Sequence, residues 1–77
     1  MVKLAEAKVG SWLRVLNISS GADYYRHRLL SEGLIPGSLF KVQWVAPLGD
    51  PVIVQLKGQH TFSLRKREAS ILEIEYV

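Results

Sequence analysis

The side chains that could bind a metal or transfer a proton are few in this sequence and widely spaced. His27 and His60 are the only two histidines, and there is no cysteine. Zinc and iron sites combine histidine, cysteine and carboxylate ligands at short, recognisable spacings, and no such pair occurs here. We therefore expect both histidines at the surface, and we predict neither a native metal site nor a cofactor.

The serines and glycines form no catalytic or phosphate-binding pattern either. Most serines fall in predicted turns, where a hydroxyl bonds to nearby backbone, and no nucleophile with its base can be recognised. Residues 33–37 (GLIPG) contain two glycines but lack the Lys-Ser/Thr that completes a phosphate-binding loop. We predict that the protein is not an enzyme.

Two basic clusters are the strongest candidates for a binding surface. They are residues 26–28 (RHR) and residues 65–67 (RKR). Small barrels can bind nucleic acid through a basic groove with stacking aromatic rings, which the tyrosines and tryptophans could supply. Acidic residues that follow the second cluster, beginning with Glu68, dilute its charge. We favour a solvated or protein-binding face and keep a small nucleic-acid-binding barrel as the alternative.

The two tryptophans differ in their expected roles. Trp44 alternates with Phe40 and Val42, so we expect it in the core. Trp12 begins a strand beside Arg14, and two interpretations are equally open. It is either an exposed anchor for a partner or the cover of one end of a barrel.

The length and composition indicate one small folded domain, residues 1–77. Hydrophobic residues make up 48% of the chain and the formal net charge is +3, a balance that argues against disorder and permits an anionic partner. There is no signal-peptide pattern and no apolar run near the ~20 residues that cross a bilayer. We expect a cytoplasmic protein that does not span a membrane. A partner or homo-oligomerisation would add stability to so small a core.

Apolar periodicity predicts five short strands and one helix. We expect the strands at residues 12–18, 39–45, 52–56, 61–64 and 71–76. The helix is expected from residue 22 or 23 to residue 32, with Asp23 at its N-terminus and Tyr25 and Leu29 in its apolar stripe. Arg26, His27 and Arg28 would lie largely outside that stripe. Residues 65–69 are expected to contain one 3₁₀-like turn.

The alternation also predicts which side chains point inward. A bulge near residues 16–17 would let Val15 and Ile18 both face the core. The last strand is expected to bury Leu72, Ile74 and Tyr76.

Glycine and proline residues that favour turns connect these elements. Gly33 suits the position just past a helix, where φ is positive, and Pro36-Gly37 suits a type II turn. Asp50-Pro51 indicates a second turn. Five strands with close turns, and a short helix between the first and second, fit an SH3-like β-barrel best.

The order of these motifs resembles the FeoA family, ferrous iron transport protein A, in its stand-alone form. The resemblance extends from about residue 9 to residue 76. The residues that carry it are Leu29-Leu30, Gly33-Leu34, Pro36-Gly37, residues 46–51 (APLGDP) and residues 64–67 (LRKR). The resemblance implies an SH3-like barrel in the cytoplasm that supports or regulates FeoB, a membrane ferrous iron permease with a GTPase domain, without carrying iron itself.

The expected contact surface for that transporter is the helix and the turn after it, residues 24–36. This segment combines basic and apolar side chains and is an insertion into a minimal barrel. We expect the partner-binding residues there to be Tyr24, Arg26, His27, Arg28 and Leu34. The loop from Pro47 to Asp50 is a second candidate.

Overall fold

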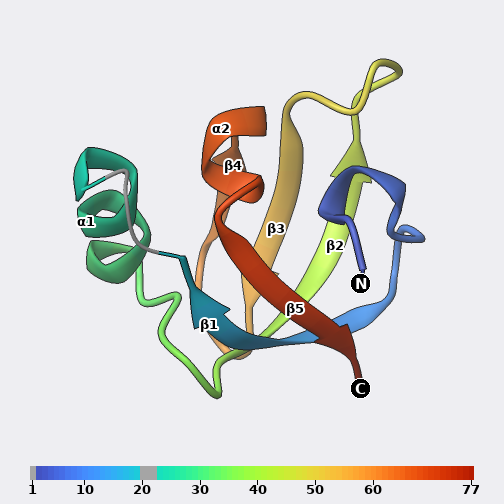
Figure 1. Ribbon diagram of the computed structural model, residues 1–77. Coiled ribbons are helices and arrows are strands. Elements are labelled where there is room, and N and C mark those ends of the chain that lie inside the picture. The colour runs from blue at the N-terminus through green and yellow to red at the C-terminus, as the bar shows by residue number, and fades with distance from the viewer. Residues whose placement is uncertain (1, 20–22) are drawn as a thin grey trace.

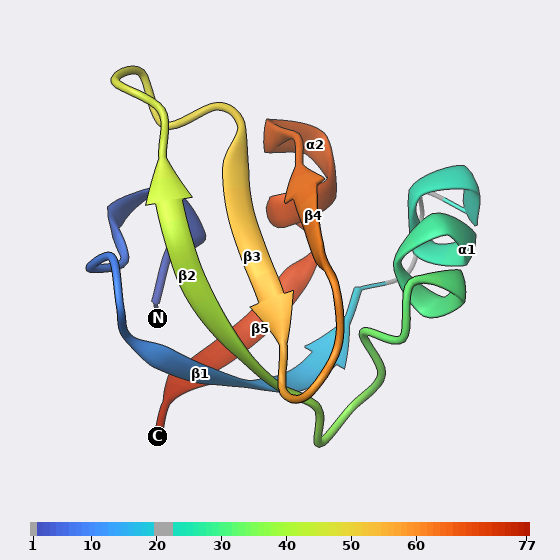
Figure 2. The same ribbon diagram turned by 180° about the vertical axis from the view of Figure 1, so that it is seen from behind.

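Five antiparallel strands form one sheet in the order β4-β3-β2-β1-β5. The computed structural model describes residues 2–19 and 23–77. The strands are β1 (Trp12–Ile18), β2 (Leu39–Val45), β3 (Val52–Leu56), β4 (Thr61–Leu64) and β5 (Leu72–Tyr76). Figures 1 and 2 show β1 and β5 crossing the steeper β2, β3 and β4, so the sheet is strongly curved.

Three short helical segments accompany the sheet. A 3₁₀ helix, η1 (Leu4–Glu6), precedes β1, and α1 (Asp23–Ser31) lies between β1 and β2. The second α-helix, α2 (Lys66–Ala69), connects the two edge strands, β4 and β5. The predicted SH3-like arrangement with its inserted helix is confirmed, and the sheet stays open between β4 and β5. The predicted 3₁₀-like turn at residues 65–69 is a turn of α-helix.

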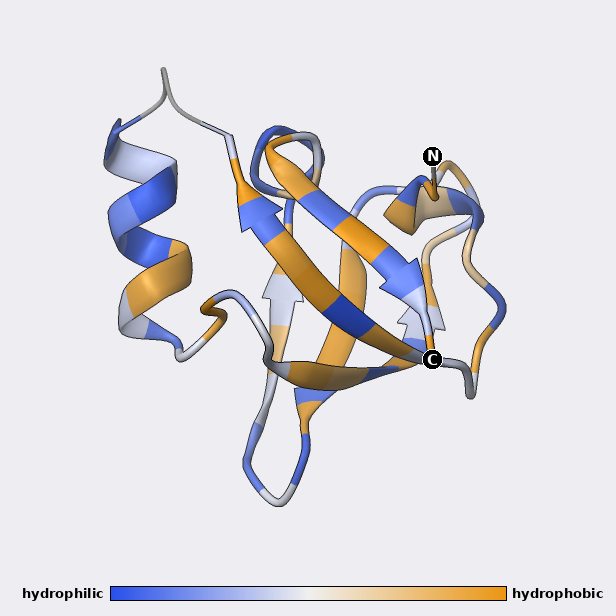
Figure 3. Cartoon of the chain, turned by 60° about the horizontal axis from the view of Figure 1, so that its bottom comes forward, coloured by the Kyte–Doolittle hydropathy of each residue, from blue (hydrophilic) through white to orange (hydrophobic). Residues whose placement is uncertain are grey.

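The core is one cluster to which all five strands contribute, together with η1, α1 and the segment after α1. Leu4 and Ala7 are buried, so the N-terminal segment packs against the sheet, a contact that the sequence patterns did not predict. Figure 3 shows α1 hydrophilic along most of its length and hydrophobic only near its C-terminal end. Leu29, at that end, is the one fully buried residue of the helix.

The bulge predicted in β1 is confirmed. Val15 pairs with Ile74 and Asn17 with Glu73, so Leu16 is the extra residue. The shift turns both Val15 and Ile18 into the core.

A second bulge, in β2, makes the prediction for Trp44 wrong. Val42 pairs with Val54 whereas Trp44 pairs with Ile53, which leaves Gln43 as the extra residue. Because side chains alternate along a strand, one inserted residue moves Trp44 to the outer face, where it is 51% exposed. Tyr76 is 49% exposed, so its predicted burial is also wrong: it lies at the end of β5, beyond the buried residues Leu72 and Ile74.

The end of α1 is a Schellman motif. The Leu34 amide donates to the Leu29 carbonyl and the Gly33 amide donates to the Leu30 carbonyl, both at 3.0 Å. Gly33 has the expected positive φ of 97°. The motif places Leu34 against the core, where its exposed fraction is 0%.

The type II turn follows directly. Gly37 has a φ of 94°, and the Ser38 amide donates to the Ile35 carbonyl at 2.9 Å. The Gly37 amide also donates to the Val15 carbonyl of β1 at 2.7 Å, which fixes the turn on the sheet.

Candidate functional site between α1 and α2

A cleft of about 480 Å³ separates α1 from α2. Its walls are Tyr24, Tyr25 and Arg28 of α1, Asp50 of the β2–β3 loop, and residues 65–68. The fold thus brings Arg28, from the first basic cluster, to the second cluster at residues 65–67, although about forty residues separate them in the chain.

One ion pair joins the two walls of this cleft. Arg28 donates from Nη1 to Oε2 of Glu68, whose side chain is only 3% exposed, while the Arg28 side chain is 36% exposed. The other carboxylate oxygen, Oε1, accepts the backbone amide of Arg65 at 2.8 Å. Both oxygens of the buried carboxylate are therefore satisfied, as a buried charge requires. Arg28 is not the free surface residue that the sequence predicted.

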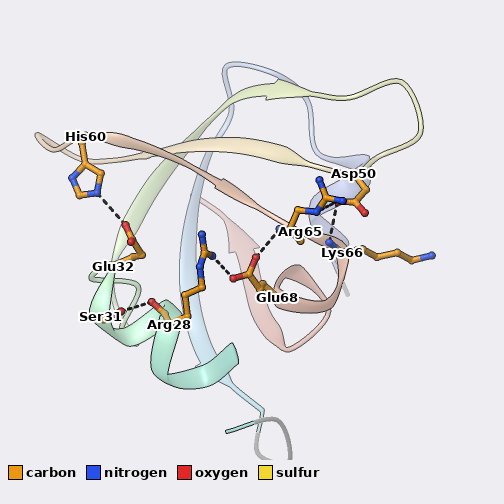
Figure 4. A network of polar contacts seen from close by, with 8 residues as sticks. All are labelled: Arg28, Ser31, Glu32, Asp50, His60, Arg65, Lys66 and Glu68. Carbon is orange, nitrogen blue, oxygen red and sulfur yellow. Dashed lines mark hydrogen bonds and ion pairs between the residues drawn. The ribbon is translucent and has the colours of Figure 1, made fainter. Parts of the chain in front are cut away.

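A second set of contacts holds the β2–β3 loop against α2. Asp50 Oδ1 lies 3.4 Å from Nε of Arg65 and accepts the Lys66 backbone amide at 3.2 Å. Figure 4 shows both ion pairs in one network, with Arg28 facing Glu68 and Arg65 facing Asp50. Two of the four cationic side chains that line the cleft, Arg28 and Arg65, are therefore paired with carboxylates of this same chain.

The other two cations have no carboxylate partner among the described residues. In Figure 4 the Lys66 side chain points away from Asp50 and Glu68. Arg67 Nη1 lies 3.4 Å from the Tyr25 hydroxyl, and this hydrogen bond raises the pKa of Arg67 above its usual value. Lys66 and Arg67 therefore give the cleft a positive rim that an anionic group can reach.

The exposed face of α1 borders the same cleft. Tyr24 is 74% exposed and packs edge-on against Tyr25, with ring centroids 5.3 Å apart. Arg26 and His27 are exposed, as predicted. In the second candidate loop, Pro47 is exposed and Asp50 is half-buried in its contacts with α2.

Leu34 is a correction to the predicted contact set. It is completely buried because the Schellman motif turns it into the core, so it supports the surface without reaching it. Glu68 is the residue that the sequence patterns missed. An acidic residue three positions after a helix-capping position is a known signal, but arginine stands here where serine or threonine normally does.

The two histidines contribute to no metal-like cluster. His60 Nε2 lies 3.1 Å from Glu32 Oε2 at the far end of α1, and His27 stands on its exposed face. Within residues 2–19 and 23–77, no three His, Cys, Asp or Glu side chains are grouped to hold a metal ion. No helix in these same segments is long and apolar enough to cross a bilayer.

Trp12 lies at another surface. It is 40% exposed and lines a shallow cleft with Leu39, Lys57 and Val77. The ring is exposed, as the interpretation of Trp12 as an anchor requires, and its contact with a partner stays a prediction.

Comparisons with known proteins agree with this architecture. Iron(II) transport protein A from Clostridium thermocellum is 35% identical with a TM-score of 0.83 over 99% of this chain; the match covers 46% of that chain, so this chain spans about half its length. FeoA from Chlorobium tepidum is 33% identical over 99% of this chain and 70% of that one, with a TM-score of 0.79.

A third neighbour supports the fold name. FeoA from Stenotrophomonas maltophilia, solved with zinc and described as a prokaryotic SH3 domain protein, is 24% identical. Its TM-score is 0.79, with 97% of this chain and 91% of that chain covered. The FeoA domain family matches residues 2–76, nearly the whole sequence. This chain, with its SH3-like sheet and inserted helix, belongs to the FeoA family, whose members are linked to ferrous iron transport.

Proposed function

We propose that this protein is a cytoplasmic accessory protein of bacterial ferrous iron uptake. It binds the FeoB-type transporter at the cytoplasmic face of the membrane and supports its activity without catalysing a reaction itself. Membership of the FeoA family gives the link to iron transport. The observation that carries a binding role is the exposed face of α1 beside a cleft whose rim holds two cations without carboxylate partners among the described residues.

The geometry suggests which residues make contact. Tyr24, Arg26 and His27 are exposed on α1, so a partner can bury them at little cost to the fold. Tyrosine and arginine are the residue types that contribute most to binding when an interface covers them. Arg28 is left out of this contact set because its guanidinium already binds Glu68.

Co-purification with the full-length transporter in detergent tests the proposal. The wild-type protein is expected to remain bound, and Arg26→Glu with Tyr24→Ala is expected to weaken binding. Lys57→Glu is the matched control, since it is exposed and makes the same charge change beside Trp12. Failure of the wild-type protein to co-purify would refute the proposal that the FeoB-type transporter is its partner. Unchanged binding of the α1 variant would exclude this helix from the contact.

A GTPase assay of the same complex gives the second readout. If the protein supports the transporter, hydrolysis or nucleotide release changes when it is added and does not change when the α1 variant is added.

The four cationic side chains that line one cleft, Arg28 and residues 65–67, also favour the alternative, a nucleic-acid-binding barrel. Phosphate contacts release counterions, so that function requires binding to generic RNA or DNA that weakens steeply with salt. Asp50 and Glu68 neutralise two of the four cations in the cleft, which is the reason to rank this function second.

A further inference from the structure

A second cleft, of about 330 Å³, lies beyond α2 from the first. Apolar side chains dominate its walls: Val2, Leu4 and Ala5 of the N-terminal segment, and Ala69 and Leu72 from the chain after β4. Figure 1 shows α2 between α1 and the N-terminal segment, and α2 contacts both α1 and η1. The helix is therefore a ridge with a cationic cleft on one side and an apolar cleft on the other.

Lys66 joins the two clefts because it lines both of them. The β2–β3 loop joins them as well, since Asp50 lines the cationic cleft and Gly49 lines the apolar one. The ion pair between Asp50 and Arg65 holds this loop against α2. A ligand long enough to cross one turn of helix can therefore occupy both clefts at once.

Each half of this groove selects a different chemical group. The cationic half offers Lys66 and Arg67, which lack carboxylate partners among the described residues and attract negative charge. In the apolar half, an aliphatic side chain that packs on these walls would gain roughly 25 cal/mol per Å² of apolar surface removed from water. A nucleic acid would satisfy the cations, but it carries no aliphatic side chain for the apolar half.

We propose that this groove binds a segment of a partner protein in which carboxylates stand next to an aliphatic side chain. The segment lies across α2, with its carboxylates at Lys66 and Arg67 and its aliphatic side chain against Leu4, Ala5 and Leu72. This inference rests on the proposed function, because the FeoB-type transporter is the partner expected to supply the segment. It adds the chemistry of the recognised segment and a second contact surface, the groove across α2, beside the exposed face of α1.

Affinity for the full-length transporter, measured at low and at high salt, tests each half of the groove. Arg67→Glu alters the cationic half, Ala5→Gln puts a polar side chain at the mouth of the apolar half, and Lys66→Glu alters both. Lys57→Glu repeats the charge change away from the groove. All four positions are exposed, so folding is expected to survive, as thermal melts would verify.

We expect Lys66→Glu and Arg67→Glu to weaken binding about tenfold or more at low salt, and less at high salt, because salt screens exposed charges. Ala5→Gln is expected to weaken binding equally at both salt concentrations, since it changes no charge. Lys57→Glu should bind as the wild-type protein does.

The outcomes separate this inference from the proposed function. If the wild-type protein binds the transporter and the groove variants match Lys57→Glu, the inference is wrong while the function stands. If the wild-type protein does not bind the transporter, the function fails, and a short peptide of alternating leucine and glutamate still tests the groove. Its binding should shift amide NMR signals on both sides of α2. Equal shifts from a serine–glutamate peptide would overturn the role of the apolar half.

Discussion

Arg28 of α1 and Glu68 of α2 form an ion pair across forty residues of chain, and the two partners differ sharply in burial. The Glu68 side chain is 3% exposed and the Arg28 side chain 36% exposed. Glu68 also accepts the Arg65 amide, so one carboxylate ties α1 to the start of α2. The relative placement of the two walls of the candidate cleft depends on this contact.

Because Glu68 is more buried than Arg28, we expect the two single variants to lower the free energy of unfolding by different amounts. Arg28→Ala leaves a buried carboxylate without its counter-charge, which should lower the free energy of unfolding by about 3 kcal/mol or more. Glu68→Ala leaves an arginine that water can reach, so its expected cost is smaller, about 1–3 kcal/mol. Urea denaturation of the two variants and of the double variant measures both costs and their coupling.

Arg26→Ala is the control for that pair, because the exposed Arg26 lies on the same helix and should change the free energy of unfolding by less than about 0.5 kcal/mol. The double variant should cost clearly less than the sum of the single variants, since the pair is lost only once. Strict additivity would show that Arg28 and Glu68 are not coupled.

Most of the fold could be predicted from the sequence because alternation and turn residues are local signals. The bounds of the first four strands and the positive φ at Gly33 and Gly37 followed from such patterns. The bulge at Gln43 could not be predicted, since it depends on how β2 pairs with β3. Trp44 alternates perfectly with Phe40 and Val42 in the sequence, and only the extra residue moves it outward.

The candidate site was less predictable for a related reason. The basic clusters are visible in the sequence, but the approach of Arg28 to the second cluster and the carboxylate partners of Arg28 and Arg65 arise from contacts between distant segments. Leu34 had the character of an apolar contact residue, and its burial follows from hydrogen bonds at the end of α1. Only the folded structure shows which cationic side chains are held in internal ion pairs, as Arg28 and Arg65 are.

The outward position of Trp44 predicts a small effect of its removal. Trp44→Ala should change the free energy of unfolding by less than about 1 kcal/mol, since half of its surface is already in water. Phe40→Ala, at a side chain that is 0% exposed, should cost about 3–5 kcal/mol. Urea denaturation measures the free energy of unfolding of both variants. A loss above about 1 kcal/mol for Trp44→Ala would show that Trp44 contributes to the core.

The scattered histidines and carboxylates predict no stabilisation by metal. A ligand that binds only the folded state raises the melting temperature, and the rise grows with the logarithm of the ratio of ligand concentration to its dissociation constant. We expect ferrous iron under anaerobic conditions, and zinc, to leave both the melting temperature and the sedimentation coefficient unchanged. His60→Ala serves as control, because a metal response that disappears with it would reveal a site built on His60 and Glu32. Metal-dependent oligomerisation would support a metal-sensing function instead.

Gly33 and Gly37 allow the backbone and packing contributions of one turn to be separated. Both have positive φ, of 97° and 94°, so alanine at either position meets the same backbone penalty of about 1–2 kcal/mol. A Cβ at Gly33 would also lie 3.2 Å from Cδ1 of Leu56, a core side chain that is 3% exposed, whereas a Cβ at Gly37 meets nothing within 4 Å. Gly33→Ala should therefore destabilise the protein more than Gly37→Ala.

Urea denaturation of both variants measures that difference, and Leu56→Ala combined with Gly33→Ala identifies its origin. Removing the Leu56 methyl groups should reduce the extra cost of Gly33→Ala, because the close contact no longer exists. If the two glycine variants are equally stable, Leu56 yields to the added methyl group and the penalty at this turn is only that of the backbone. If the extra cost persists without Leu56, it arises from disruption of the Schellman motif that buries Leu34.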